Sequence, residues 1–249
     1  MCKPNHTKKN LIFDIKNALR SLGRTYNFLQ VVIGPVLRND YLEKQFQKIV
    51  DDHPKKQFLN LGCGTSRGKA NLKNLDCYLG SNVDVVADLH QIPLADNSLD
   101  GVTSVAVLEH IKEPTIVVKE TLRILKPGAI AHFNIPFMQP YHASPDDFQR
   151  FTSSGLRHLF RNFEIIELQS MGGPASAMVW LTTEFLSISL SFGIKQLHAL
   201  LFILFTSILW PFKFLDIILR CYPTSQIMTS NFSLLLRKPE KKIVNWRKY

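Results

Sequence analysis

The sequence predicts an α/β fold with a mostly parallel β-sheet, and three features of the chain predict it. From residue 57 onward, short apolar runs of strand length alternate with longer stretches of helical spacing, as in successive βαβ units. A glycine-rich turn directly follows the first of these runs, and a last apolar run lies close to the end of the 249 residues. A chain of this length can bury the core that such a domain needs and still carry additions.

Four apolar runs in the middle of the chain are predicted to form buried strands, and a fifth is predicted to close the sheet. The four are Phe58–Leu61, Val83–Val86, Gly101–Val107 and Ile130–Ile135, and the fifth is Asn231–Lys238. Between the third and fourth runs, Thr115–Leu125 has the spacing of a helix. The sequence Lys126-Pro127-Gly128 is expected to end that helix.

The chain divides into four segments by composition. Residues 1–56 are predicted to form a helical lead-in, and residues 57–173 hold the alternating strands and helices of the core. Residues 174–230 are rich in Leu, Ile, Phe and Ser, and they are predicted to form a hydrophobic helical insertion ahead of the last strand. Residues 231–249 comprise that strand and a basic tail.

The formal net charge of +10 is carried by the two ends of the chain. Residues 1–24 and 237–249 each hold six basic residues and one acidic residue, whereas residues 25–236 hold 18 of each sign. A neutral body with two basic tails argues against a nucleic-acid-binding face across the folded domain, and it fits an anionic membrane surface. Tails that are merely solvated are the alternative.

Cysteine usage indicates a reducing compartment. The four cysteines are scattered, without a Cys-x-x-Cys pair and without histidines at zinc-binding spacing, so we expect neither a disulfide framework nor a metal site. The first ten residues are polar, and Gly34-Pro35 interrupts the first apolar run, which does not fit a secretion signal. These features predict a protein on the cytoplasmic side.

The turn Gly62-Cys63-Gly64 and the acids that follow it point to a nucleotide-like ligand. Glycines directly after a buried strand let the backbone approach a ligand closely. The turn has neither the spacing of the dinucleotide fingerprint nor the Walker lysine. Asp76 closes the run Asn74-Leu75-Asp76, a further predicted strand, and a carboxylate at the end of a strand can accept hydrogen bonds from both hydroxyls of a ribose. A second acid, Asp88, follows the Val83–Val86 run.

Five segments, in this order, resemble the class I S-adenosylmethionine-dependent methyltransferases. They are FLNLGCGTS (58–66), NLD (74–76), VADLHQIPLADNSLDGV (86–102), VLEH (107–110) and LRILKPGA (122–129). The resemblance implies a doubly wound, Rossmann-like sheet of seven strands and S-adenosyl-L-methionine as the cofactor. It also implies the cofactor contacts, which are Gly62 and Gly64 under the methionine moiety, Asp76 on the ribose, Asp88 and Leu89 around the adenine, and Val105 lining the same pocket.

Two positions depart from the pattern of that family. Asn60 stands where the family usually has Asp, and Ser66 stands where it often has Gly. Asn60 can still form hydrogen bonds, but it lacks the negative charge that favours a sulfonium cation. The departures favour an alternative in which a catalytically degenerate domain serves as a scaffold at a membrane.

The acceptor is expected to approach two segments beyond the carboxyl ends of the strands, Glu109-His110 and residues 136–152. Methyl transfer to a hydroxyl requires alignment of the reactants and removal of a proton, and a histidine suits the second task. We predict His142 as this base, with Asp146 or the neighbouring Asp147 orienting it or the acceptor. Arg150 is predicted to hold an anionic group of the acceptor.

Structural roles for these polar residues are the competing interpretation. Asp146 and Asp147 can instead cap a helix that is expected to continue through Phe160. His110 is expected to be a structural histidine or a pocket wall, and His132, inside an apolar strand, is expected to be a core residue with satisfied hydrogen bonds.

The apolar insertion points to a membrane. Gln196–Phe212 holds no Asp, Glu, Lys or Arg, but it is slightly shorter than the roughly 20 residues of a spanning helix. A single crossing would separate the last strand from its sheet, and Glu184 and Lys195 make two full passes costly. We therefore predict helices partly buried in one leaflet, and the alternative is a helical subdomain or a dimer interface. The residues expected near the lipid headgroups are Trp180, Trp210, Lys213 and Arg220.

The sequence as a whole predicts an S-adenosylmethionine-dependent methyltransferase at the cytoplasmic, inner face of a membrane. Its acceptor is expected to be a small molecule, a lipid or a lipid-linked glycan that is methylated at a hydroxyl. Besides the scaffold, a third interpretation is an RNA methyltransferase that uses the basic tails and binds RNA with a steep salt dependence.

Overall fold

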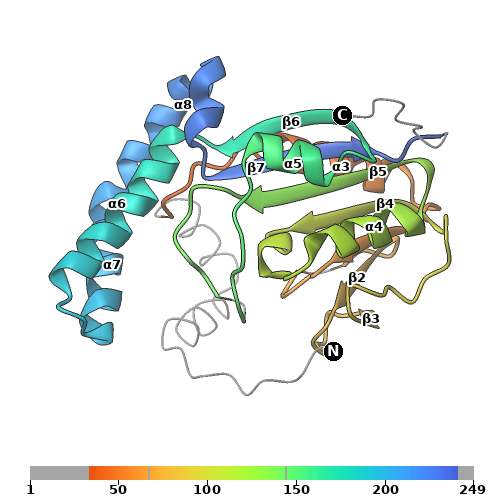
Figure 1. Ribbon diagram of the computed structural model, residues 1–249, viewed down its shortest axis with the longest axis horizontal. Helices are drawn as coiled ribbons and strands as arrows, with labels where there is room; N and C mark the ends of the chain where they lie inside the picture. The colour runs from red at the N-terminus through yellow and green to blue at the C-terminus, as the bar shows by residue number, and fades with distance from the viewer. Residues whose placement is uncertain (1–33, 67, 144, 241–249) are drawn as a thin grey trace.

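Seven strands form one sheet in the order β3-β2-β1-β4-β5-β7-β6 (Figure 1). The neighbouring strands β3, β2, β1, β4 and β5 run parallel to one another, whereas β7 is antiparallel to both β5 and β6. The computed structural model describes residues 34–240 except Arg67 and Ser144, so the first part of the predicted lead-in and most of the basic tail lie outside the described residues. The strands are β1 (Phe58–Leu61), β2 (Leu72–Asp76), β3 (Val85–Val86), β4 (Leu99–Val105), β5 (Leu125–Pro136), β6 (Glu164–Gly172) and β7 (Asn231–Arg237). The predicted fold class is confirmed.

The main difference from the predicted elements concerns β5. The sequence Lys126-Pro127-Gly128 does not form a loop after the helix but belongs to the first part of this strand, in which Leu125 is paired with Leu99 of β4. Helix α4 stops at Ile124 because a residue that precedes proline is pushed out of the helical region, and the chain therefore becomes extended at once. Because Pro and Gly are typical of turns, the sequence did not predict that this segment belongs to a strand.

Helices cover both faces of the sheet (Figure 1). Phe46 of α3 packs against Phe58, whereas Val117 of α4 belongs to the main core together with Leu59. Because neighbouring residues of a strand point to opposite faces, Phe58 and Leu59 place these two helices on opposite sides of the sheet. The helical segments that precede β6 are α3 (Tyr41–Asp52), η1 (Leu108–His110), α4 (Pro114–Ile124) and α5 (Ser153–Leu159).

The free energy of unfolding is expected to fall as the pH is lowered from about 6.5 to about 4, because of His132. This side chain is fully buried between the hydroxyls of Thr103 and Ser233, and burial lowers its pKa to about 4. Between these pH values the unfolded chain binds a proton that the folded chain does not bind, so acid favours unfolding by up to about 3 kcal/mol. Urea denaturation at pH 7, 5 and 4 measures the effect. His132→Gln should flatten the pH dependence, and an unchanged slope in that variant would contradict the assignment.

The chain between β6 and β7 folds into the helical insertion that the fold class includes. Helices α6 and α7 form a hairpin that projects beyond the end of the sheet toward which β4 and β5 point (Figure 1). Within the described part of the chain, one helical run, Lys195–Leu219, is long and apolar enough to cross a membrane, and only 17% of its most apolar window is buried. The segments of the insertion are α6 (Pro174–Leu190), α7 (Lys195–Leu209), η2 (Trp210–Leu215), α8 (Asp216–Leu219) and η3 (Pro223–Met228).

Buried polar side chains attach the insertion to the rest of the domain. The carboxylate of Asp216 accepts hydrogen bonds from the backbone N–H groups of Ala175 and Ser176 at 2.8 and 2.9 Å, and it thereby caps the first turn of α6. Gly173 leaves room for this carboxylate, with which a Cβ would collide. The ammonium of Lys213 is also buried and donates to the carbonyl of Gly34 at 2.7 Å, so the expectation that Lys213 reaches lipid headgroups is wrong.

Candidate active site

The glycine turn lies at the edge where the parallel strands have their carboxyl ends. Gly62 and Gly64 adopt φ angles of 64° and 53°, a region that glycine occupies without strain. A Cβ on Gly62 would come within 2.6 Å of the Val107 side chain, whereas no described residue lies within 4 Å of the corresponding position on Gly64. The turn is therefore packed on the core at its first glycine and open at its second, where the backbone can face a ligand.

Asp76, the last residue of β2, holds this turn in place. Its Oδ2 accepts a hydrogen bond from the N–H of Gly64 at 2.9 Å, and its Oδ1 accepts one from the N–H of Tyr78 at 3.1 Å. Each carboxylate oxygen has a further lone pair that can accept a hydroxyl. Burial and the neighbouring charge of Asp76 raise the pKa of the Cys63 thiol to about 11, so the thiol stays neutral.

Asn60 has a specific partner in the structure. Its amide nitrogen donates to the Oδ1 of Asn74 at 3.1 Å. The amide nitrogen of Asn74 in turn donates to the carbonyls of Ser66 and Asn82, at 2.8 Å in both cases. An aspartate at position 60 could not donate to Asn74 and would face its amide oxygen. The asparagine that departs from the family pattern is thus part of a chain of amides that joins β1, β2 and the glycine turn.

The predicted adenine contacts lie next along the same edge. The N–H of Ala87 donates to the carbonyl of Asp76 at 3.0 Å, which places Asp88 one residue beyond the ribose position. Burial would raise the pKa of Asp88, but hydrogen bonds from the backbone and the ring of His90 hold it below its ordinary value. The side chain of Leu89 is buried in the core, so a ligand can be reached only by its backbone.

Val105 ends β4 at the same edge and is half-buried. The next residue, Ala106, has a φ of 54°, which is unusual for a residue with a side chain. Strained backbone of this kind is found preferentially at functional sites. The chain turns sharply there and continues into η1, which carries Glu109 and His110.

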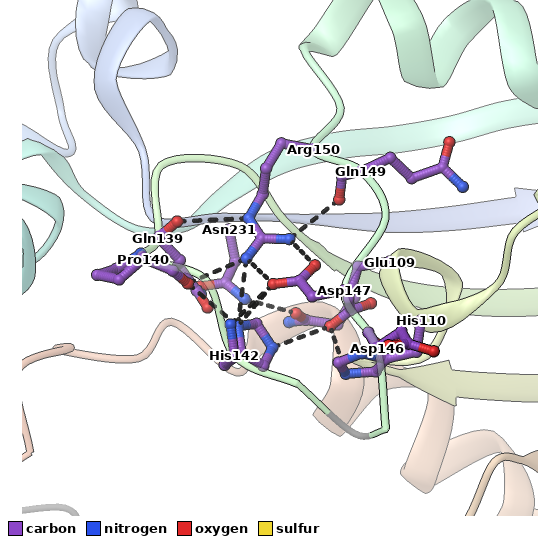
Figure 2. Close-up of polar contacts among 11 residues, drawn as sticks. Glu109, His110, Gln139, Pro140, His142, Asp146, Asp147, Gln149, Arg150 and Asn231 are labelled. Carbon is purple, nitrogen blue, oxygen red and sulfur yellow. Dashed lines mark hydrogen bonds and ion pairs between the residues drawn. The ribbon is translucent and has the colours of Figure 1, made fainter. Parts of the chain in front are cut away.

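The loop after β5 folds back onto η1 and completes a polar cluster (Figure 2). The N–H of Phe148 donates to the carbonyl of Glu109 at 2.8 Å, and the side chain of Gln149 donates to the carbonyl of Ile111 at 2.7 Å. These two bonds fix the loop over the carboxyl ends of β4 and β5, and they bring His142 beside Glu109 and His110.

Glu109 lies at the centre of this cluster. Its Oε1 is 3.5 Å from His142 Nε2 and 3.7 Å from His110 Nε2, and the side chain is fully buried. Neither carboxylate oxygen has a hydrogen-bond partner among the described residues. The two rings meet edge to face, with their centroids 5.2 Å apart. His142, the predicted base, is about one third exposed and is the member of the cluster that an acceptor can reach.

Asp147 and Arg150 support His142 from the opposite side. Asp147 accepts the backbone N–H of His142 at 2.8 Å and forms an ion pair with Arg150. Hydrogen bonds from Arg150 and His142 hold the pKa of Asp147 below its usual value, although burial alone would raise it. Each guanidinium nitrogen of Arg150 already has a partner, among them the carbonyls of Gln139 and Pro140. The ion pair therefore positions the loop.

Of the two predicted acids, it is Asp147 that contacts His142. The side chain of Asp146 is exposed, and this residue joins the cluster through its backbone carbonyl, which accepts from His110 Nδ1 at 2.6 Å. Neither acid caps a helix, because α5 begins at Ser153 with the hydroxyl of Thr152 accepting from Gly155. The helix-cap interpretation is therefore wrong.

Sequence reasoning undervalued Glu109 and His110. The pair was identified as one of two candidate segments, but His110 was expected to be structural and no role was given to the carboxylate. Thirty-two positions separate His110 from His142, so no local spacing reveals that the rings touch. An acidic residue directly after a buried strand was the signal that could have drawn attention to Glu109.

Residues 67–133 match a family described as a methyltransferase domain. The matched segment begins just after the glycine turn and ends in the second half of β5, and the sheet order is that of the doubly wound methyltransferase fold. The chain contains a class I S-adenosylmethionine-dependent methyltransferase domain.

Proteins similar to this methyltransferase domain include two bacterial enzymes. Demethylmenaquinone methyltransferases of Corynebacterium glutamicum and Renibacterium salmoninarum are 27% and 26% identical to it over 142 and 149 residues. The matches cover 50% and 52% of this chain but 61% and 57% of those proteins, so less than two thirds of their length is spanned. Among solved structures, phosphoethanolamine N-methyltransferase 2 of Haemonchus contortus is 16% identical with a TM-score of 0.47, over 89% of this chain and 60% of that one.

S-adenosyl-L-methionine is the methyl donor that a domain of this family implies, and the residues at the strand ends fit it. The open space beside Gly64 admits a ligand against the backbone, and Asp76 has acceptor capacity left for ribose hydroxyls. Of the predicted cofactor residues, Gly62, Gly64, Asp76 and Val105 lie along one edge of the sheet, and Asp88 follows at the next strand end.

Proposed function

We propose that this protein transfers a methyl group from S-adenosyl-L-methionine to a hydroxyl of a membrane-embedded small molecule, such as a lipid or a lipid-linked glycan, at the cytoplasmic face of the membrane. The observation that carries the membrane part of this proposal is the surface of the insertion between β6 and β7, where many large apolar side chains are exposed while several polar side chains are buried.

The interior of the α6–α7 hairpin is as polar as it is apolar. The buried residues of α6 are Ala175, Ser176, Ala177, Val179, Thr183 and Ser187, and Thr206 is the buried residue of α7. The large apolar residues with at least two fifths of their surface exposed on the insertion include Phe185, Ile188, Phe192, Leu200, Ile203, Leu204, Ile208, Phe212, Ile217 and Ile218. An exposed apolar surface of this extent is abnormal in water and normal in lipid.

The dimensions of the hairpin favour insertion into one leaflet. Helices α6 and α7, of 17 and 15 residues, are about 25 and 22 Å long, whereas the hydrocarbon core of a bilayer is about 30 Å thick. The longer run Lys195–Leu219 has the length to cross, but it includes the buried Lys213 and Asp216, which bond to Gly34 and to the first turn of α6. Lys195 lies at the tip of the hairpin, and Glu184 pairs with His198 at 3.0 Å between the helices. Helices that lie along the interface let Lys195 reach headgroups, while the Glu184–His198 pair stays internal.

The hairpin and the candidate site leave the sheet at the same edge. In the register of the sheet, Pro136 of β5, Asn231 of β7 and Gly172 of β6 are neighbours, and α6 starts two residues after Gly172. The loop that carries His142 is tied to this point, because Gln139 donates to Asn231. An acceptor held in the leaflet would therefore enter at the side of the domain where Glu109, His110 and His142 lie.

The chain's own residues divide the work of the reaction between two groups. When bound, S-adenosylmethionine supplies an electrophilic methyl group, which the glycine turn and Asp76 would hold at the ends of β1 and β2. The polar cluster at the ends of β4 and β5 would receive the acceptor oxygen, and the fixed loop over η1 would align it for in-line attack. The small-molecule acceptors in the names of the similar enzymes support an acceptor of this size.

The structure weakens the reason for the scaffold alternative. That interpretation depended on Asn60 and Ser66, and both now have roles in holding the glycine turn, Asn60 through Asn74 and Ser66 through its carbonyl. Asn60 lacks the negative charge of an aspartate, but the hydrogen bonds that hold the glycine turn are present.

Transfer of a labelled methyl group tests the proposal directly. Purified protein and labelled S-adenosylmethionine, incubated with membrane extract, should place the label in the lipid-soluble fraction. Asp76→Ala should abolish the incorporation, whereas Asp100→Ala, which removes a carboxylate at the opposite edge of the sheet, should not. Label in RNA, or no label although the cofactor binds, would contradict the proposal and favour the RNA methyltransferase or the scaffold respectively.

A further inference from the structure

We propose that Glu109, His110 and His142 bind a divalent transition-metal ion. One ligand atom from each of these residues lies within 4.8 Å of the others, and the three residues come from η1 and the loop that folds over it (Figure 2). The residue pattern predicts no metal site, because the histidines are not at metal-binding spacing in the sequence.

The distances within the cluster are those of ligands around an ion. Separations of 3.5 and 3.7 Å between Glu109 Oε1 and the two Nε2 atoms are too long for good hydrogen bonds. Metal–ligand bonds of about 2.0–2.1 Å in tetrahedral arrangement put ligand atoms roughly 3.4 Å apart. The three side chains therefore leave a space of the size of an ion between them.

Glu109 supplies an independent observation. Its side chain is fully buried, it points into the cluster, and both oxygens are without a hydrogen bond in the described part of the chain. A buried carboxylate without partners is costly, and such groups are normally paired or bound to a metal. A cation between Glu109 and the two rings would satisfy it.

The second ring nitrogens are arranged as in metal-binding histidines. His110 Nδ1 donates to the carbonyl of Asp146 at 2.6 Å. His142 Nδ1 lies 3.3 Å from both the carbonyl of Pro140 and Nη2 of Arg150, so it donates to Pro140 in one tautomer and accepts from Arg150 in the other, and the metal site requires the first. A histidine that donates through Nδ1 presents the lone pair of Nε2, and both Nε2 atoms face Glu109. The surrounding hydrogen bonds thus orient both rings toward one point.

The set of ligands indicates the kind of ion and leaves a place for the acceptor. Two imidazoles and one carboxylate suit Zn²⁺, Mn²⁺ or Fe²⁺ better than Mg²⁺ or Ca²⁺, which prefer oxygen ligands alone. Three protein ligands leave at least one position open. His142 is partly exposed, so this position faces the side from which the acceptor would approach.

The role of the ion rests on the proposed function. An acceptor hydroxyl bound at the open position would lose its proton to solvent more readily. An oxygen lone pair would then form the O–CH₃ bond while the C–S electron pair returns to sulfur, which changes from sulfonium to thioether. The ion would take over the task predicted for His142 as a free base, and His142 would hold it.

Metal binding is tested on the full chain independently of methyl transfer. After chelation and dialysis, titration with Zn²⁺ and Mn²⁺ should show one site per chain, and Zn²⁺ at 100 times its Kd should raise Tm by about 5 °C. Glu109→Gln and His142→Gln should each weaken binding at least 100-fold and remove this shift. His158→Gln changes an exposed histidine of α5 and should bind as the wild type does.

The outcomes separate the site from the reaction. Each variant should still bind S-adenosylhomocysteine, which shows that it is folded. If the wild type does not bind the metal, or if Glu109→Gln binds it as tightly as the wild type does, the proposed metal site is contradicted. The cluster would then be an ordinary contact between a glutamate and two histidines. Methyl transfer that persists after complete removal of the ion would overturn its role in the reaction, whereas loss of transfer that Zn²⁺ or Mn²⁺ restores would support it.

Discussion

Replacing Asp76 by alanine is expected to weaken the binding of S-adenosylhomocysteine at least 100-fold. The variant would lose two charge-assisted hydrogen bonds from the carboxylate to the ribose, each worth about 1.5–3 kcal/mol. Because about 1.4 kcal/mol corresponds to a tenfold change in affinity, the loss of both bonds corresponds to at least 100-fold. The variant would also lose the hold on the N–H of Gly64, so that the turn is less well organised for the ligand. Isothermal titration calorimetry measures the change.

Two variants distinguish the loss of ligand contacts from a general loss of stability. Asp100→Ala removes a carboxylate that likewise accepts a backbone N–H, from Gln57, and pairs with Lys126, but at the other edge of the sheet. Asp76→Asn keeps an oxygen for Gly64 and loses the charge. Asp100→Ala should bind as the wild type does, and Asp76→Asn should lie between the wild type and Asp76→Ala. If the wild type and Asp76→Ala bind S-adenosylhomocysteine with equal affinity, the assignment of Asp76 to the ribose is contradicted.

The second large effect is expected on the exposed apolar face of α7. Replacing Leu200, Ile203, Leu204 and Ile208 by glutamine should reduce the binding of the protein to vesicles of phosphatidylethanolamine and phosphatidylglycerol at least 100-fold. Each of these side chains is about half-exposed or more, and each contributes roughly 1 kcal/mol or more when it enters hydrocarbon. Flotation of the protein with vesicles in a density gradient measures the effect.

The matched control replaces exposed apolar residues of the core domain. Val86 and Ile166 are 52% and 40% exposed, and their replacement by glutamine should leave flotation unchanged. If the face of α7 instead formed a dimer interface, the fourfold variant would convert a dimer into a monomer in light scattering, and the wild type would remain at the bottom of the gradient. That result would contradict association with lipid.

The fold could be predicted well from the sequence because its signals are local. The run Phe58–Leu61 is a strand with the predicted bounds, and β7 was expected as the last strand from an apolar run near the end of the chain, although its antiparallel orientation was not predicted. The prediction was poorer where tertiary pairing overrides local composition. Pro127 and Gly128 look like a loop, but the neighbouring Leu125 and Ile130 pair with β4 and make the segment part of a strand.

The site could be predicted only in part, for the same reason. The predicted cofactor residues lie at or just after strand ends, so Gly64 and Asp76 could be proposed from their positions in the sequence. The acceptor side depends on how the loop of residues 137–152 folds back, which no periodicity specifies. The contact of His142 with Glu109, and the choice of Asp147 over Asp146, follow from that loop. The role of Asn60 also could not be predicted from the sequence, because it depends on a hydrogen bond to Asn74 in a neighbouring strand.

The position of β7 has a consequence for how the protein is made. This strand lies between β5 and β6, and β6 is joined to the sheet through β7 alone. During synthesis, α6 and α7 leave the ribosome before β7 does. The apolar helices are therefore exposed while the place of β7, between β5 and β6, is still empty. If they meet lipid at that stage, the last strand closes the sheet of a chain that is already anchored. Attachment to the membrane would then be a step in completing the catalytic domain.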